Sequence, residues 1–290
     1  MAARFAWVLN LDADLELAAG PGYALRKSLR LAMKPHVERL AAALLGPHDV
    51  LVDDEGAAGA ARGLVGRAFC PTPRALAVLA RAGANPEPHP AFDVLRRVNS
   101  RAFTSALGTT LPGAAFVTDL EAARTMLRAE PPEGSGWRVK HAFGMAGRNQ
   151  RIVSPRSLDG AGLGFLRAGI DGGGVQIEPN VAIEVEYALH GVLDRDGAVT
   201  CGSLVRQRCN AHGAWLATEP VSPREAGQLG DRMVEEARFV ARALSAAGYF
   251  GPFGVDAFTY RDRAGVLQLQ PRSEINARYS MGFADGWGRR

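Results

Sequence analysis

Three polar side chains near the end of the chain could together bind a metal ion. Asp256 follows an apolar run, and Glu274 and Asn276 lie two apart beyond a second, alternating run. A charged turn at 261–265 separates the runs, so they are expected to form a strand hairpin in which residues two apart share a face. Such oxygen ligands suit Mg²⁺, which usually binds one or two carboxylates together with the phosphate oxygens of a substrate. A solvated hairpin with scattered acids is the alternative.

A lysine in the middle of the chain is a second candidate for ligand binding. Lys140 lies in an apolar strand segment, and only three of the 34 basic residues are lysines. In a chain that otherwise uses arginine, this favours a need for a compact point charge on a flexible stem. The loop that follows contains Gly144, Gly147 and Arg148, and its backbone N–H groups could bind phosphate oxygens. A strand lysine with a solvated ammonium group is the alternative.

Taken in order along the chain, from about residue 92 to 282, these segments resemble the ATP-grasp superfamily. Lys140 and its glycine loop look like the phosphate-binding strand and lid of that superfamily. The segment that contains Gln176, Glu178 and Val181 looks like its adenine-binding hinge. Glu186 resembles the acid that holds the ribose hydroxyls. The resemblance implies that Glu178 and the hinge backbone contact adenine.

The end of the chain continues the resemblance. Asp256, Glu274 and Asn276 match the metal ligands of the superfamily, and Arg278 lies where an arginine near the transferred phosphoryl group is common. We expect Arg278 to steady an acyl-phosphate. Arg206 could assist, because it shares a predicted strand face with a second arginine two residues on, although strand alternation alone explains that spacing.

Two departures from the superfamily pattern affect these assignments. Arg101 stands where the family usually has a lysine for the α and β phosphates; arginine keeps the charge but prefers bidentate oxygens. Residues 271–273 lengthen the distance from Asp256 to the acid, and Gln270 lies where compact members carry glutamate. We assign the metal position to Glu274 because the Glu-Ile-Asn spacing fits better.

The resemblance implies an α/β (α+β) protein with the ATP-grasp fold. Residues 1–91 would form a small N-terminal αβ domain and residues 92–290 the ATP-grasp domain, with a lid at about 109–176 and a metal and substrate subdomain at about 177–290. The implied activity is an ATP-dependent carboxylate–amine ligase that forms an amide or peptide bond through an acyl-phosphate and releases ADP and phosphate. Its cofactors would be ATP and Mg²⁺, with Mn²⁺ as a substitute. A small-molecule kinase on the same fold and a non-catalytic nucleotide-binding protein are the alternatives.

Composition agrees with a globular enzyme, and the resemblance implies that its partners are a small-molecule carboxylate and an amine. Of the 290 residues, 47% are hydrophobic and 22% are charged, which argues against disorder. The net charge of +4 is dispersed, so nucleic acid is not an expected partner. Three cysteines without paired spacing predict neither a disulfide framework nor a zinc site, which favours the cytoplasm. No apolar run is long enough for a signal peptide or a membrane span. A homodimer is compatible with these features.

The expected elements alternate in the N-terminal part and become rich in strands after residue 175. Prolines at 86, 88 and 90 mark the expected domain boundary. Thr72 would cap a helix that opens with Pro73. The predicted strands are 5–11, 49–52, 66–70 and 111–117 together with both hairpins, and the predicted helices are 23–45, 73–82, 93–107, 119–129, 157–168 and 222–247.

Overall fold

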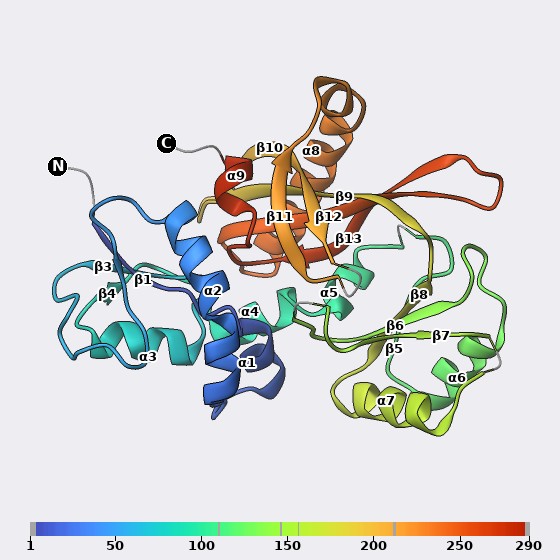
Figure 1. Ribbon diagram of the computed structural model, residues 1–290, viewed down its shortest axis with the longest axis horizontal. Coiled ribbons are helices and arrows are strands. Elements are labelled where there is room, and N and C mark those ends of the chain that lie inside the picture. Colours follow the sequence, from blue (N-terminus) through green and yellow to red (C-terminus); the bar gives the residue numbers. More distant parts are fainter. Residues whose placement is uncertain (1–3, 110, 146, 156, 211–212, 288–290) are drawn as a thin grey trace.

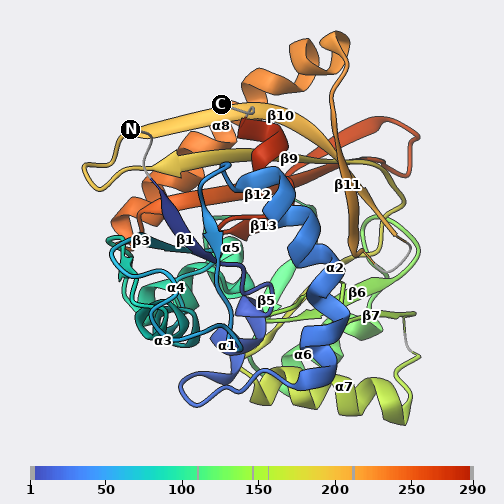
Figure 2. The same ribbon diagram turned by 60° about the vertical axis from the view of Figure 1, so that its left-hand side comes forward.

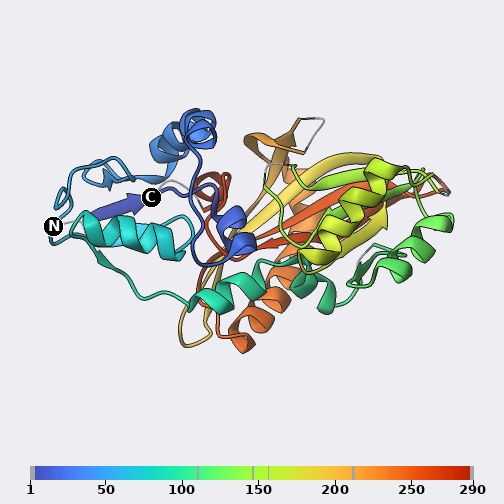
Figure 3. The same cartoon turned by 90° about the horizontal axis from the view of Figure 1, so that it is seen from below.

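The structure, a computed structural model, describes residues 4–109, 111–145, 147–155, 157–210 and 213–287. Three sheets with their helices follow one another along the chain (Figure 1). The N-terminal part lies at one end of the long axis, and the lid lies at the other end, which strands of the C-terminal sheet also reach (Figure 3). The chain thus folds into three successive parts, each built on a sheet of its own.

The N-terminal sheet is parallel, with the strand order β2-β1-β3-β4. Its buried strand β1 serves two cores because alternate side chains point to opposite faces. Ala6 and Val8 pack against α3, whereas Trp7 and Leu9 belong to a core shared with the C-terminal sheet. The elements are β1 Phe5–Val8, α1 Ala13–Ala19, α2 Lys27–Leu44, β2 Val50–Leu51, β3 Val65–Ala68, α3 Pro73–Arg81 and β4 Asn85–Pro86.

The connection to the lid was predicted as one helix and is two. Its elements are α4 Phe92–Val98 and α5 Arg101–Ala106. The break at Asn99 and Ser100 has a local cause, because Ser100 accepts a hydrogen bond from the Ala102 N–H as the cap of α5. The Asn99 side-chain amide also donates to the Ala277 carbonyl and accepts from the Ala277 N–H, which connects the break to the C-terminal sheet.

The lid is an antiparallel sheet with the order β5-β8-β6-β7. One face packs on helices through Val139, Ile177 and Leu166. Strand alternation therefore puts Lys140 and Glu178 on the opposite face. The elements are β5 Ala115–Val117, α6 Leu120–Arg128, β6 Trp137–His141, β7 Gln150–Val153, α7 Gly160–Asp171 and β8 Val175–Pro179.

The C-terminal sheet is antiparallel with the order β11-β10-β9-β12-β13, and α8 covers one face. Helix α8 begins with the capping box of Ser222 and Glu225 and with proline in its first turn. Strand β12 continues past Asp256 to Arg261, where the predicted charged turn begins. The elements are β9 Ile183–Leu193, β10 Val199–Cys209, β11 Trp215–Pro220, α8 Pro223–Ala246, β12 Gly251–Arg261, β13 Leu267–Asn276 and α9 Phe283–Trp287.

Helix α2 lies against the β10–β11 hairpin (Figure 2). The Arg39 guanidinium donates to the Leu216 carbonyl at 2.9 Å and lies over the Trp215 ring at 5.5 Å. None of the helices in the described ranges combines the length and the apolar character that crossing a membrane requires.

Candidate functional site

A cavity of about 930 Å³ lies where the N-terminal sheet, the lid and the C-terminal sheet meet. All three parts contribute to its wall: Asp14 comes from α1, Lys140 from the lid, and Asp256 and Glu274 from the C-terminal hairpin. This cavity contains most of the residues selected from the sequence. Those that line it are Arg101, Lys140, Gly144, Gly147, Arg148, Glu178, Val181, Glu186, Arg206, Asp256, Glu274, Asn276 and Arg278.

The three predicted metal ligands meet on one face of the β12–β13 hairpin. Asp256 and Glu274 are directly opposite each other in the antiparallel register, and Asn276 lies opposite Gly254. The Asp256 carboxylate accepts hydrogen bonds from the amides of Gln207 at 2.8 Å and Asn276 at 2.9 Å. Gln207 escaped the sequence analysis, although its place next to Arg206 in an alternating strand puts it on the cavity face.

The electrostatics of this pair suit a divalent cation. Burial and then the charge of Glu274 raise the pKa of Asp256 to about 7, against the lowering effect of its hydrogen bonds with Gln207 and Asn276. Within the described ranges, no group of three or more acidic, histidine or cysteine side chains could hold a metal. The third ligand would therefore be the amide oxygen of Asn276. Two carboxylates and an amide oxygen fit Mg²⁺.

The register explains how the longer segment before Glu274 is accommodated. It shifts between Asp256 and Phe258, so that Phe258 pairs with Gln270 and Asp256 with Glu274. Residues 271–273 are absorbed in this irregularity. Gln270 is only 3% exposed and does not line the cavity, whereas Glu274 does. The geometry thus favours Glu274 as the metal-binding acid.

On the lid, Lys140 forms an ion pair with Glu178, which the sequence analysis placed at adenine. Its ammonium group lies 2.5 Å from the carboxylate of Glu178, whose side chain is only 4% exposed. The side chain of Glu178, expected at adenine, is therefore the counterion of the lysine. The cause is the register of β6 and β8, which puts Lys140 opposite Gln176 and Arg138 opposite Glu178 on one face. Gln176 is 6% exposed and does not line the cavity.

Arg101 links the lid to the metal site. It was predicted to hold the α and β phosphates, but its guanidinium donates to the His141 carbonyl and to Glu274, each at 2.7 Å. A Cβ on Gly144 would lie 3.0 Å from this guanidinium, so the close approach of the loop requires glycine. Gly147 and Arg148 line the cavity, and Gly147 has a φ of 73°.

The Arg206 side chain forms an ion pair with Glu225. Its guanidinium contacts Glu225 at 2.6 Å, and the Tyr187 hydroxyl donates to the same carboxylate at 2.8 Å. Burial acts to raise the pKa of Glu225, but hydrogen bonds from Ser222, Arg206 and Tyr187 outweigh it and lower that pKa to about 2. Arg206 lines the cavity while its guanidinium is held by Glu225 of α8, and its part in steadying an acyl-phosphate stays a prediction.

Arg278 also has an internal partner, from the N-terminal domain. It donates to Asp14 at 2.8 and 3.2 Å, and its guanidinium lies 5.2 Å from the centre of the Phe69 ring. Asp14 was missed in the sequence, although three acids at alternate positions directly after a predicted strand were visible. The other two, Asp12 and Glu16, are engaged in a separate network.

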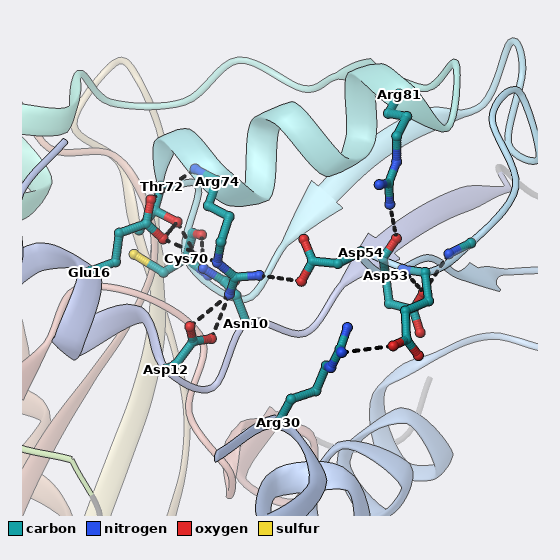
Figure 4. A network of polar contacts seen from close by, with 12 residues as sticks. Asn10, Asp12, Glu16, Arg30, Asp53, Asp54, Cys70, Thr72, Arg74 and Arg81 are labelled. Carbon is teal, nitrogen blue, oxygen red and sulfur yellow. Dashed lines mark hydrogen bonds and ion pairs between the residues drawn. The ribbon is translucent and has the colours of Figure 1, made fainter. Parts of the chain in front are cut away.

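That network centres on Arg74 at the start of α3 (Figure 4). Its guanidinium binds both oxygens of Asp12 at 2.6 and 2.8 Å and Asp54 at 2.8 Å. Glu16 accepts from the Thr72 hydroxyl at 2.6 Å and from the Arg74 N–H at 2.8 Å. Thr72 is the N-cap residue of α3, as predicted, but its hydroxyl donates to Glu16 and makes no capping hydrogen bond with the helix backbone.

Comparison with known proteins confirms the fold. No family profile matches the chain, and no curated protein matches its sequence. A D-cycloserine synthetase structure is 15% identical with a TM-score of 0.55, covering 99% of this chain and 95% of its own. D-alanyl-alanine synthetase A from Vibrio cholerae is 12% identical with a TM-score of 0.52, covering 100% and 95%. N5-carboxyaminoimidazole synthetase from Staphylococcus aureus, complexed with ADP, is 14% identical with a TM-score of 0.52, covering 100% and 79%.

These likenesses show that the chain has the ATP-grasp fold, as the resemblance of its motifs implied. The site assignments rest on the cavity itself.

Proposed function

We propose that this protein is an ATP-dependent ligase that joins a small-molecule carboxylate to an amine. The proposal rests on the combination of residues that line one cavity. There, a lid cation, Lys140, is combined with the oxygen ligands Asp256, Glu274 and Asn276. Phosphoryl transfer depends mainly on positioning and on neutralisation of phosphate charge, which these groups are suited to provide.

In this proposal Asp256, Glu274 and Asn276 hold Mg²⁺, which would neutralise charge on the phosphates. Lys140 binds a phosphate oxygen in place of Glu178, and the loop with Gly144 and Gly147 lies alongside. Arg101 keeps its bonds to Glu274 and His141, so it orients the metal acid and the lid strand. The nucleoside lies along the start of β9, where the cavity is lined by Val181, Glu184 and Glu186.

The reaction that follows has two steps. A carboxylate oxygen bonds to the γ-phosphorus while the bond between that phosphorus and the β–γ bridging oxygen breaks, which releases ADP. An amine nitrogen then bonds to the acyl carbon, the carbon–oxygen bond to phosphate breaks, and the nitrogen loses a proton to solvent. The proposal has support from the structural neighbours, since those named above are a D-cycloserine synthetase, a D-alanyl-alanine synthetase and an N5-carboxyaminoimidazole synthetase complexed with ADP.

Trapping with hydroxylamine tests this function. With Mg-ATP and a panel of carboxylic acids, we expect a hydroxamate together with ADP and phosphate, because hydroxylamine intercepts an acyl-phosphate. Release of AMP and pyrophosphate would contradict the mechanism. A stable phosphorylated product formed without any amine would indicate a kinase, and ATP binding without turnover on any acid would indicate a non-catalytic protein. A cytoplasmic location and a homodimer stay predictions.

A further inference from the structure

The end of the cavity beside α1 differs in character from the end beside the lid. Its apolar wall is formed by Leu11, Met33, Phe69 and Met281. Among these side chains lies one ion pair, Asp14 with Arg278, whose side chains are 11% and 13% exposed. An apolar pocket with a few placed polar groups is the usual form of a small-molecule site.

The charges at this end balance each other. The Arg278 fork binds both oxygens of Asp14, at 2.8 and 3.2 Å. A planar guanidinium fits a ligand carboxylate equally well, and a buried aspartate fits an ammonium group. A ligand that carries both groups can exchange partners with the pair and leave neither charge unpaired, which avoids the large cost of an isolated buried charge. A phosphate group would add negative charge beside Asp14.

The acids on either side of Asp14 explain why it is the one at the cavity. Asp12 is bound by Arg74, and Glu16 by Thr72 and the Arg74 backbone (Figure 4). These contacts fix both ends of the first turn of α1. Asp14, between them, is left facing the C-terminal sheet, where Arg278 is its partner.

A serine adds a further polar group to the same wall. The Ser280 hydroxyl oxygen is buried and has no hydrogen-bond partner among the described residues, although Ser280 lines the cavity. A buried hydroxyl without a partner costs free energy unless a ligand or water satisfies it. It lies two residues after Arg278, beside the groups that would hold a ligand.

We propose that this end of the cavity binds an amino acid with a free ammonium group, a free carboxylate and an apolar side chain, and that this molecule is the acid that is activated. The proposal rests on the ligase function proposed above. Arg278 follows Asn276 by two residues and lines the same cavity as Asp256 and Glu274. A carboxylate bound to Arg278 therefore lies on the side of the metal acids. The ammonium group bound to Asp14 keeps its proton, so the attacking amine comes from the second substrate.

Calorimetry on the full chain tests the ligand class. The probes are leucine, methionine and phenylalanine in both configurations. The matched controls are N-acetylleucine, which lacks the ammonium group, 3-methylbutylamine, which lacks the carboxylate, and ribose 5-phosphate. We expect at least one amino acid to bind tenfold or more tightly than the controls. Binding of ribose 5-phosphate or N-acetylleucine as tight as that of every amino acid would overturn the proposal.

Two variants assign the groups. Asp14→Asn should remove the preference for leucine over N-acetylleucine, and Arg278→Gln should remove the preference over 3-methylbutylamine. Glu219→Gln is the control, because it removes one carboxylate from another ion pair in the cavity wall, that with Arg208, and should leave both preferences unchanged. Unchanged preferences in Asp14→Asn would overturn the assignment.

ATP binding, measured separately in each variant, distinguishes this proposal from the ligase function. Asp14→Asn should bind Mg-ATP as the unaltered protein does, which also shows that it is folded. Failure of the unaltered protein to bind ATP would reject the ligase function while the amino-acid measurement still stood. Hydroxamate formation only with acids that lack an amino group would reject the amino-acid proposal and leave the ligase function in place.

Discussion

Two groups of carboxylates in this molecule differ in what balances them. In the N-terminal domain, Asp12 is fully buried and both its oxygens are bound by the Arg74 guanidinium. In the C-terminal hairpin, Asp256 receives its side-chain hydrogen bonds from neutral amides and lies opposite another acid, Glu274. A carboxylate bound to a cation has its charge compensated within the fold. A pair of facing carboxylates gains from a divalent cation.

The two groups of carboxylates therefore differ in the role that their surroundings suggest, structural in the N-terminal domain and chemical in the hairpin. The network around Arg74 joins β1, α1 and α3 and fixes α1 beside the cavity. The hairpin acids are held just as firmly by the register of β12 and β13, yet burial and the charge of Glu274 raise the pKa of Asp256 to about 7. A carboxyl with a raised pKa in a cavity is a candidate for a functional site, whereas the Arg74 network connects elements of the N-terminal domain.

Removal of one hairpin charge should have the largest effect. Glu274→Gln keeps the shape of the side chain and its acceptor for Arg101, but it removes a charge that would bind Mg²⁺. We expect turnover of ATP to fall on the order of 10²–10³-fold, the scale of losing one electrostatic group in an active site. Steady-state release of phosphate measures it. Glu219→Gln, at another acid in the cavity wall, should retain turnover, and normal turnover in Glu274→Gln would reject the metal site.

Breaking the N-terminal network should act on stability. Arg74→Leu leaves Asp12 and Glu16 buried without the cation, so we expect unfolding free energy to fall by about 3 kcal/mol. Urea unfolding at pH 7, followed by circular dichroism, measures the change. Arg206→Leu is the control, since its ion pair with Glu225 is 41% exposed on the arginine side and should be worth at most about 1 kcal/mol. Equal losses in both variants would show that the Arg74 network has no special role.

The ion pair of Lys140 and Glu178 in the lid combines features of the two groups of carboxylates. Its charges compensate each other within the fold, but in the proposed function a phosphate takes the place of Glu178 at Lys140. Lys140→Met should weaken ATP binding by about 1.5–3 kcal/mol, the scale of a hydrogen bond to a charged group. Calorimetry measures the affinity. The double variant Lys140→Met with Glu178→Gln removes the unpaired acid as well, and it should recover stability but not affinity. Recovery of affinity in the double variant would make Lys140 a structural residue.

The hairpin could be predicted from the sequence because its information is local. Alternation and the Glu-Ile-Asn spacing place Glu274 and Asn276 on one face, and the charged turn brings them to Asp256. Helices with strong end signals were also predicted closely: the segment 222–247 is α8, Pro223–Ala246, which has a complete capping box.

The partners of the cations could not be predicted, because they depend on contacts between distant segments. Arg278 and Asp14 are 264 residues apart in the chain, and Arg101 and Glu274 are 173 apart. The pairing of Lys140 with Glu178 depends on the register of β6 and β8, which no local pattern determines. The ion pairs of Lys140 with Glu178 and of Arg206 with Glu225 escaped the sequence analysis for this reason.

The smallest expected effect, and the most direct test of the comparison, is the pH dependence of stability in Asp256→Asn. The pKa of Asp256 is raised from 3.8 to about 7, so the folded protein holds this proton more tightly than the unfolded chain. Its contribution to stability is therefore fully present below pH 3.8 and is lost as pH rises through about 7. With chelator present, the stability of Asp256→Asn relative to the unaltered protein should rise by about 1–2 kcal/mol between pH 6 and pH 8.

The difference in unfolding free energy between Asp256→Asn and the unaltered protein removes the contributions of other titrating groups, because both proteins contain them. His190 is one of them: its burial lowers its pKa to about 4, so it costs stability as pH falls below 6.5, which is the opposite trend. Both proteins contain His190, and the difference isolates Asp256. Addition of Mg²⁺ at pH 8 should then stabilise the unaltered protein and leave Asp256→Asn nearly unchanged, because the cation binds the ionised pair. Parallel pH profiles for the two proteins would mean that Asp256 is as well compensated as Asp12, and the contrast between the two groups of carboxylates would not hold.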